Sequence, residues 1–407
     1  MKRILLAATL MVAAPAATWA DPQDFDQVER GRYLTTMGDC IACHTAPGGK
    51  PFAGGRDIET PFGHLLSPNL TSDQATGIGA WTDDEFVRAM HEGVDREGRH
   101  LYPAFPYVYY THVTREDALA IRAYLATVPP MVNKVVTNQL PFPMDVRASL
   151  RAWNELNFKP GDFKPDATRS ADWNRGNYIV NGLGHCGLCH TPKNVSGGDE
   201  TGRFLQGELL QGWYAPNITG DNREGIGAWS VDDIAEYLRT GHNAIAAASG
   251  PMAEEVEQSS YGLADADLHA IAVYLKDVPG QGRAVQPADP NSPAMQAGAV
   301  LYGDQCSACH TRAGVGVDRL FPALAHAPVV QQPNAASLVR VVLQGAQSAQ
   351  TPGAPTGPAM PAFGWKLSDG QVADVVTYIR NAWGNAGSAV PTNDVRSQRA
   401  GLTKRTE

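Results

Sequence analysis

The sequence predicts an all-α fold that is built from three tandem helical units. All six cysteines fall in three pairs with two residues between them, and a histidine directly follows each pair. A helix-like segment with a central glycine precedes each pair, and a helix-like segment with a tyrosine closes each unit. Proline-rich connectors lie between these repeats. Because prolines mark the ends of regular elements, the connectors indicate the borders of the units.

The chain has 407 residues, which is enough for two to four ordinary domains. We predict a first unit at residues 21–130, a second unit at 169–280 and a third unit at 294–387. Residues 131–168 and 281–293 are the linkers. The first linker contains an amphipathic stretch at 144–158, which we expect to pack over the first and second units; a helix for a partner or a membrane surface is the alternative. Residues 388–407 are polar and are predicted to be a disordered tail.

The first twenty residues have the pattern of a secretory signal peptide. Lys2 and Arg3 precede an apolar run, and Thr18 to Ala20 offer a small-x-small cleavage site. We therefore expect a mature protein that starts near Asp21 in the periplasm, with an uncleaved anchor as the alternative. No later segment has the roughly 18 to 20 continuous apolar residues of a membrane span, so any membrane attachment is expected to be peripheral.

The cysteine pattern is the attachment signature of haem c. Disulfides, thioredoxin-like pairs and zinc sites also use paired cysteines, but they do not require the histidine after every pair. Two thioether bonds must reach the two vinyl groups on one porphyrin edge, and the next residue then presents its imidazole to the iron. The sequence therefore predicts three covalently bound haems c. The attachment residues are Cys40, Cys43 and His44; Cys186, Cys189 and His190; and Cys306, Cys309 and His310.

Three glycines occupy matching places eight to ten residues before the first cysteine of each pair, namely Gly31, Gly176 and Gly298. A glycine inside a helix costs about 1 kcal/mol relative to alanine, so its repetition suggests a packing reason. We predict that two helices cross closely there, with the ring of Tyr124, Tyr274 or Tyr378 laid over the gap. Ordinary core residues of small helical domains are the simpler alternative.

The first and second units share further segments and resemble an internal duplication. Residues 68–73 (PNLTSD) match 216–221 (PNITGD), and residues 77–81 (GIGAW) match 225–229 with the same letters. An acidic helix start follows each tryptophan. The third unit is shorter and more divergent.

The sixth ligand of each iron sets its potential and reactivity, and methionine raises the potential. Met252 follows Gly250-Pro251, and Met360 lies between Ala359 and Pro361. An isolated methionine is more often core filler, but the proline context and the position after the histidine favour Met252 and Met360 as iron ligands.

The first unit departs from this pattern, because Phe105 stands where the methionine is expected and cannot bind iron. We favour His91 as its sixth ligand, then Met90, then a vacant site. Ordinary roles, helix core for Met90 and a surface position for His91, are the alternatives. His100 and His112 are weaker candidates. The remaining histidines are expected to be structural or exposed: His64, His185, His242, His269 and His326.

These features together resemble the cytochrome c subunits of membrane-associated bacterial dehydrogenases that oxidise alcohols, gluconate, sorbitol, fructose or aldehydes. The resemblance rests on residues 38–45 (GDCIACHT), 49–55 (GKPFAGG) and 101–107 (LYPAFPY) and covers nearly the whole mature chain. It implies three tandem class I cytochrome c domains. Many members have methionine in the first distal loop. The phenylalanine form resembles subunits that are paired with molybdenum-containing aldehyde or N-heterocycle dehydrogenases.

The resemblance also implies a role in respiration. A dehydrogenase partner oxidises the substrate, and the haems pass the electrons to ubiquinone or to a downstream cytochrome or oxidase. A net charge of −9 argues against binding to nucleic acid and suits an encounter with a basic patch on a redox partner. A multihaem peroxidase with an open first haem, or a free-standing electron shuttle, is the alternative. The sequence has no nucleotide-binding or nucleophile-elbow motif of its own.

Overall fold

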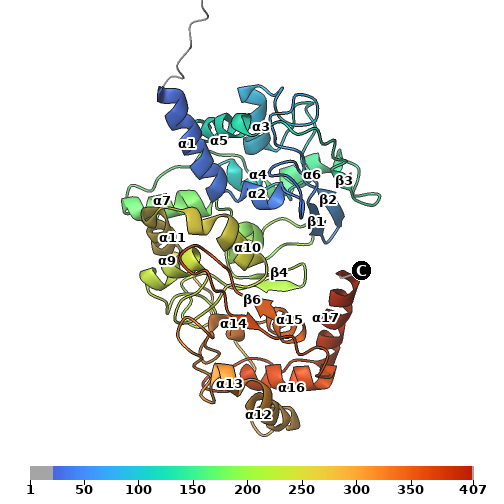
Figure 1. Cartoon of the computed structure of the whole chain (residues 1–407), viewed down its shortest axis with the longest axis vertical. Coiled ribbons are helices and arrows are strands. Elements are labelled where there is room, and N and C mark those ends of the chain that lie inside the picture. The colour runs from blue at the N-terminus through green and yellow to red at the C-terminus, as the bar shows by residue number, and fades with distance from the viewer. Residues whose placement is uncertain (1–21, 406–407) are drawn as a thin grey trace, which may run out of the picture.

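The computed structural model describes residues 22–405, so the predicted signal peptide at 1–20 lies outside the described residues. Three pairs of crossing helices follow one another along the long axis of the molecule (Figure 1). The pairs are α1 with α5, α7 with α11, and α12 with α16. None of the described helices is long and apolar enough to cross a membrane.

The helices and strands follow the three units. The first unit contains α1 (Pro22–Met37), α2 (Cys40–Cys43), β1 (Asp57–Thr60), β2 (Gly63–Leu66), α3 (Asp83–Glu92), α4 (Tyr107–Tyr110) and α5 (Arg115–Thr127). The first linker contains β3 (Asn138–Gln139) and α6 (Ser149–Asn157). The second unit contains α7 (Ala171–Val180), α8 (Gly187–His190), η1 (Thr201–Arg203), β4 (Glu208–Leu210), β5 (Trp213–Ala215), α9 (Val231–Thr240), α10 (Pro251–Gln258), η2 (Ser260–Gly262) and α11 (Asp265–Asp277). The remainder contains α12 (Pro293–Gln305), α13 (Ser307–His310), α14 (Pro328–Gln331), α15 (Ala336–Gln344), β6 (Ala346–Gln347), β7 (Ala359–Met360), α16 (Asp369–Ile379) and α17 (Thr392–Arg405).

Close helix crossings explain the repeated glycines. A Cβ atom at Gly31 would lie 1.8 Å from the carbonyl oxygen of Ala120, and one at Gly176 would lie 2.0 Å from that of Ala270. At Gly298 the nearest atom is the carbonyl oxygen of Asp374, at 2.2 Å. The Cβ atoms of the predicted tyrosines Tyr124, Tyr274 and Tyr378 lie 2.7 to 2.9 Å from the same three points. The predicted glycine–tyrosine crossing is thereby confirmed in all three units.

The acidic helix starts seen in the sequence are capping boxes. Thr82 and Glu85 exchange side-chain and backbone hydrogen bonds at the start of α3, and Ser230 and Asp233 do the same at α9. Such a reciprocal cap satisfies backbone N–H groups that have no partner within the helix. It also fixes where each helix begins after its tryptophan.

Short antiparallel strands qualify the all-α prediction, although most of the regular structure is helical. The strand orders are β1-β2-β3, β4-β5 and β6-β7. In the β4–β5 turn, Gln211 and Gly212 both have positive φ (51° and 73°), as two-residue hairpins require. The strands have two to four residues, which is too short for an alternating pattern to be visible in the sequence.

The hydrophobic cores do not divide in the same way as the three predicted domains. A single core cluster contains Leu34 and Ile121 of the first unit together with Ile179 and Leu275 of the second. The third unit has a separate core, which includes Val376. The first two units therefore form one packed body, and the shared core leaves the prediction of three tandem domains unconfirmed.

The predicted disordered tail at 388–407 is wrong for most of its length, because residues 392–405 form α17. Val395 is fully buried in the third core, and Arg399 donates to Asp369 at 2.7 Å and to the carbonyl of Leu367 at 2.8 Å. The helix packs against α15 and α16 (Figure 1). Because its contacts are largely polar and tertiary, its sequence lacks the apolar stripe by which packed helices are predicted.

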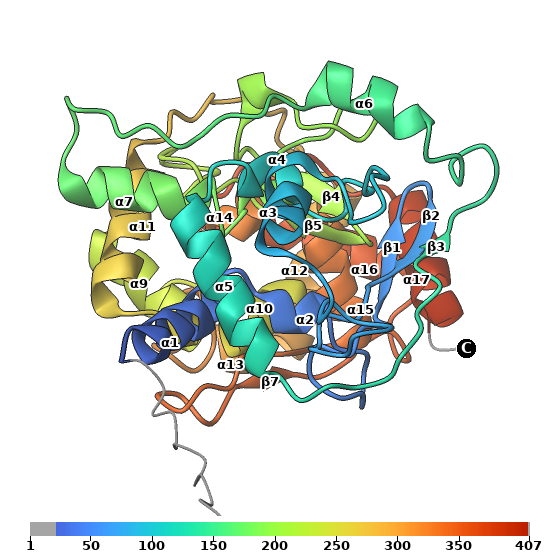
Figure 2. The same ribbon diagram turned by 90° about the horizontal axis from the view of Figure 1, so that it is seen from above.

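The first linker packs on both neighbouring units. Asn154 of α6 accepts a hydrogen bond from the Tyr107 hydroxyl at 2.6 Å, and the Trp153 indole donates to the carbonyl of Ser196 at 2.8 Å. From above, α6 lies at the edge of the molecule (Figure 2). The linker thus ties the distal loop of the first unit to the second unit.

Candidate haem-binding sites

Each cysteine pair lies in one short helical turn, in α2, at α8 and at α13. The backbone N–H of each histidine donates to the carbonyl of the first cysteine at 3.0 Å. One turn therefore places both sulfurs on one side and projects the imidazole from the next residue. All six cysteines are free thiols, and the second cysteine of each pair is exposed. The described residues contain no disulfide, which leaves every thiol available for a thioether bond.

A proline carbonyl orients each of the three histidines by accepting a hydrogen bond from Nδ1. The pairs are His44–Pro68 at 2.8 Å, His190–Pro216 at 2.7 Å and His310–Pro322 at 3.0 Å. Burial lowers the pKa of all three imidazoles, which the proline carbonyl opposes in part. The rings are therefore neutral, and Nε2 is the nitrogen that remains for a metal. A backbone carbonyl on the second nitrogen is the usual support of a metal-binding histidine.

Sequence reasoning did not identify these prolines as part of the site. The sequence did contain a clue for Pro68 and Pro216, because each begins one of the two matching segments of the duplicated units. It contained no such clue for Pro322, which belongs to no repeated segment. A role that depends on a backbone carbonyl leaves little trace in residue type, because any residue has one.

The two candidate methionines lie in segments that meet at the border between the second and third units. Met252 is the second residue of α10, and Met360 lies in β7, where it pairs with Ala346 of β6. Both side chains are half-buried. An isolated antiparallel bridge joins Ser249, shortly before Met252, to Ser348 just after β6.

In the first unit, Phe105 packs edge-to-face on Tyr110 with the ring centres 5.4 Å apart. Met90 is buried in the shared core and is only 5% exposed. His91 lies in the last turn of the same helix, α3, and its Nε2 is buried without a hydrogen-bond partner in the described part of the chain. Burial lowers the pKa of His91, and hydrogen bonding to the backbone of Val113 opposes this shift.

The weaker histidine candidates have other partners. His100 Nδ1 pairs with the Asn154 amide at 3.3 Å, and His112 donates to the carbonyl of Asn181 at 3.1 Å. These contacts place His100 against the linker and His112 against the second unit. Among the histidines predicted to be structural, three pair with neighbouring side chains: His64 with Asp57, His242 with Thr240 and His269 with Asp172.

Two buried hydrogen-bond donors in the second unit indicate whether its residues fit a haem. Trp229 Nε1 and Asn217 Nδ2 are both buried without a hydrogen-bond partner in the part of the chain that the structure describes. They belong to the two segments that the duplicated units share. Buried donors are almost always paired in folded proteins, and the carboxylates of haem propionates would satisfy both. This donor set fits a haem beside His190.

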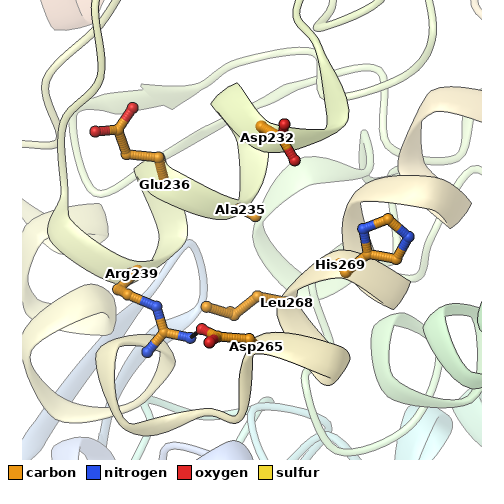
Figure 3. A pocket seen from close by; sticks show the side chains of 7 residues that line it. All are labelled: Asp232, Ala235, Glu236, Arg239, Asp265, Leu268 and His269. Atoms are coloured by element: carbon orange, nitrogen blue, oxygen red, sulfur yellow. Dashed lines mark hydrogen bonds and ion pairs between the residues drawn. The ribbon is translucent and has the colours of Figure 1, made fainter.

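One surface hollow of the described residues lies away from these sites. It lies between α9 and α11 and has a volume of about 270 Å³ (Figure 3). Its lining includes an ion pair between Arg239 and Asp265, and it contains none of the predicted haem ligands. The volume is below the roughly 300–1,000 Å³ of typical small-molecule sites.

Three turns with two cysteines and an oriented neutral histidine define a c-type cytochrome. A family model described as Cytochrome c matches residues 28–129 and 295–383. The chain is 40% identical to the gluconate 2-dehydrogenase cytochrome c subunit of Pantoea cypripedii, over 98% of this chain and 95% of that protein. It is 38% identical to the cytochrome c subunit of the quinone alcohol dehydrogenase of Gluconacetobacter polyoxogenes, over 97% of this chain and 87% of the relative. It is 36% identical to the cytochrome subunit of the fructose dehydrogenase of Gluconobacter japonicus, over 98% of this chain and 88% of that protein.

The chain therefore belongs to the cytochrome c family, in the group that contains the cytochrome c subunits of gluconate, alcohol and fructose dehydrogenases. Membership in this family implies covalently bound haem c. The resemblance inferred from the sequence is thereby confirmed.

Proposed function

We propose that the chain carries three haems c and transfers electrons from a partner dehydrogenase to a respiratory acceptor. The observation that supports this most directly is the threefold repetition of a cysteine turn with a proline-oriented histidine. Each haem supplies one-electron redox chemistry at its iron. The protein attaches the haem through two cysteines, keeps the imidazole neutral and oriented, and supplies the sixth ligand.

We assign Met252 to the second haem and Met360 to the third, because both lie in the loops expected to face the histidines. For the first haem we assign His91, whose buried Nε2 lacks a partner in the described residues, ahead of Met90, which is packed in the core. Two histidine ligands give a lower potential than a histidine and a methionine. The first haem is then the one with the lowest potential.

The names of the relatives and the predicted signal peptide support a proposal for the partner and the location of this chain. The relatives are named as subunits of gluconate, alcohol and fructose dehydrogenases, which supports a dehydrogenase catalytic subunit as the partner of this chain. The predicted signal peptide supports export to the periplasm. We propose ubiquinone or a downstream cytochrome or oxidase as the acceptor, at the outer face of the inner membrane with peripheral attachment.

Ligation of the first haem is tested by replacing His91 with alanine. Electron paramagnetic resonance of the wild type should show three low-spin haems, and the variant should convert one of them to a high-spin form that binds carbon monoxide. Met90→Leu is the matched control and should leave all three low-spin. An unchanged His91→Ala spectrum with an altered Met90→Leu spectrum would move the assignment to Met90. A high-spin first haem in the wild type would favour the peroxidase alternative.

The role in a complex is tested by purifying the tagged full chain from its native host. A large oxidoreductase subunit should co-purify, and its substrate should reduce the haems of the isolated complex. Recovery of the cytochrome alone, with no substrate-driven reduction after membrane extraction, would favour a free-standing electron shuttle instead.

A further inference from the structure

The cysteine turns of the first and second units lie against each other. A Cβ atom at Gly38 would lie 3.3 Å from the sulfur of Cys40 and 3.6 Å from Cδ2 of Leu183, which comes from the second unit. The segments that lead into the first two attachment turns therefore pack on each other at this point.

Two aromatic side chains, one from each unit, fill this contact. His185 directly precedes Cys186, and its ring packs on Tyr110 with the ring centres 5.7 Å apart and the planes inclined by 39°. The Tyr110 hydroxyl donates to the carbonyl of Gly38 at 3.5 Å. A continuous series of contacts thus runs from Cys186 through two rings to Gly38, which is two residues from Cys40.

The conformation of His185 indicates that the contact is imposed by the surrounding structure. Its φ is 34°, a region that residues other than glycine hold only where their surroundings require it. Burial lowers the pKa of His185 to about 4, so the ring is neutral near pH 7. The corresponding position is Asp39 in the first unit and Gln305 in the third, and Gln305 accepts from Lys366 instead. Among the three attachment turns, only that of the second unit has an aromatic ring directly before its first cysteine.

We propose that His185 and Tyr110 form the bridge through which the first and second haems exchange electrons. The inference rests on the proposed haem content. With both haems bound, one electron would pass from the reduced haem to the oxidised one, and the neutral His185 ring would take up no proton. Electron tunnelling weakens steeply with distance and weakens faster across gaps than through packed or bonded atoms. Two rings in contact between the attachment segments would therefore shorten the gaps that the electron has to cross.

The bridge is tested by measuring electron exchange between the first two haems after flash reduction of the full-length protein. In His185→Leu and Tyr110→Leu, the exchange rate should fall by roughly an order of magnitude, whereas the midpoint potentials and low-spin spectra stay unchanged. Tyr178→Phe is the matched control, because it alters the same interface away from the cysteine turns and should leave the rate unchanged.

An unchanged rate in both leucine variants, with unchanged potentials, would overturn the bridge. If His185→Leu fails to retain the second haem, Tyr110→Phe decides the question: it keeps the ring but loses the bond to Gly38, so its rate should lie between those of the wild type and Tyr110→Leu. If Tyr110→Phe and Tyr110→Leu both exchange electrons at the wild-type rate, the proposal is contradicted. Haem content, measured beforehand by mass spectrometry, separates these outcomes from a failure of the proposed function, which would show as fewer than three attached haems.

Discussion

Single residues at the attachment turns are adapted to contacts from other units. Gly187 lies between the two cysteines of the second turn, and a Cβ atom there would lie 2.3 Å from the hydroxyl oxygen of Tyr109 and 2.8 Å from Phe204. The Tyr109 hydroxyl donates to Asp199 of the second unit. Ile41 and Ser307 hold the matching positions in the other turns. The glycine is therefore required by the packing of the first unit on the second, and the attachment chemistry itself does not need it.

Replacing Gly187 with alanine should destabilise the protein by about 1–3 kcal/mol, the usual cost of overpacking a filled site. Adding Tyr109→Phe removes the clashing oxygen and should restore part of the loss. Thermal unfolding followed by circular dichroism measures both effects. Gly202→Ala is the control, because a Cβ atom there meets nothing within 4 Å. Equal melting temperatures for Gly187→Ala and Gly202→Ala would contradict the packing argument.

At the scale of elements, the same crossing of two helices occurs before each attachment turn. The first helix of each pair carries the glycine and precedes the cysteine turn, and the second helix carries the tyrosine. The crossing thus determines where the turn starts relative to the rest of the unit. The atoms closest to each glycine belong to the backbone of the second helix. Backbone atoms inside a helix cannot shift as a flexible side chain can, so there is no space for a larger residue at the glycine.

Helix α12 allows a matched test of this crossing, because it contains two glycines. Gly298→Ala brings a Cβ atom to 2.2 Å from the backbone oxygen of Asp374 and should lower the melting temperature of the third unit. Gly303→Ala meets nothing within 4 Å and should stabilise α12 by up to about 1 kcal/mol through helix propensity. Calorimetry of the two full-length variants checks the prediction, which is wrong if both shift the melting temperature in the same direction.

At the scale of the whole molecule, the first and second units pack like the two halves of a symmetric dimer. Tyr33 of the first unit donates to Asp267 of the second at 2.6 Å, and Tyr178 of the second donates to Asp117 of the first at 2.6 Å. Arg30 and Arg175 bond the carboxylates of their own units. Such reciprocal contacts are characteristic of a two-fold interface. A duplication that kept this interface explains why the two units share one core.

The reciprocal tyrosines predict an alkaline weakening of this interface. Burial and the hydrogen bond to a carboxylate raise the pKa of Tyr33 and of Tyr178 to about 12, against an ordinary value of about 10. Their contribution to stability is therefore fully present below about pH 10 and is lost as the pH rises towards 12. Tyr33→Phe and Tyr178→Phe should each destabilise the protein by about 1 kcal/mol at pH 7, which lowers the melting temperature. Between pH 10 and 12, the melting temperature of these variants should fall less steeply than that of the wild type.

Tyr261→Phe is the control for this prediction, because Tyr261 lies at the surface with 38% of its area exposed. Its melting temperature should follow that of the wild type over the whole range. Curves for Tyr33→Phe and Tyr178→Phe that run parallel to the wild type between pH 10 and 12 would refute the role of the reciprocal pairs.

The sequence by itself determined the features that depend on local geometry. Two cysteines and a histidine must share one turn to hold a haem, so their spacing is visible in the chain. A glycine and a tyrosine that recur at matching places likewise predicted the helix crossings, and the structure confirms them. The family followed from the same residues. The assignments of Met252, Met360 and His91 to iron remain predictions.

Only the tertiary structure decided how the units combine. The shared core of the first two units, the reciprocal bonds of Tyr33 and Tyr178, and the contact of His185 with Tyr110 join residues far apart in the chain. Helix α17 is held by buried Val395 and by polar contacts of Arg399, which no local pattern reveals. The carbonyls of the prolines act through the backbone, which is common to all residues. Contacts of this kind depend on three-dimensional proximity, and a periodic pattern in one segment does not encode them.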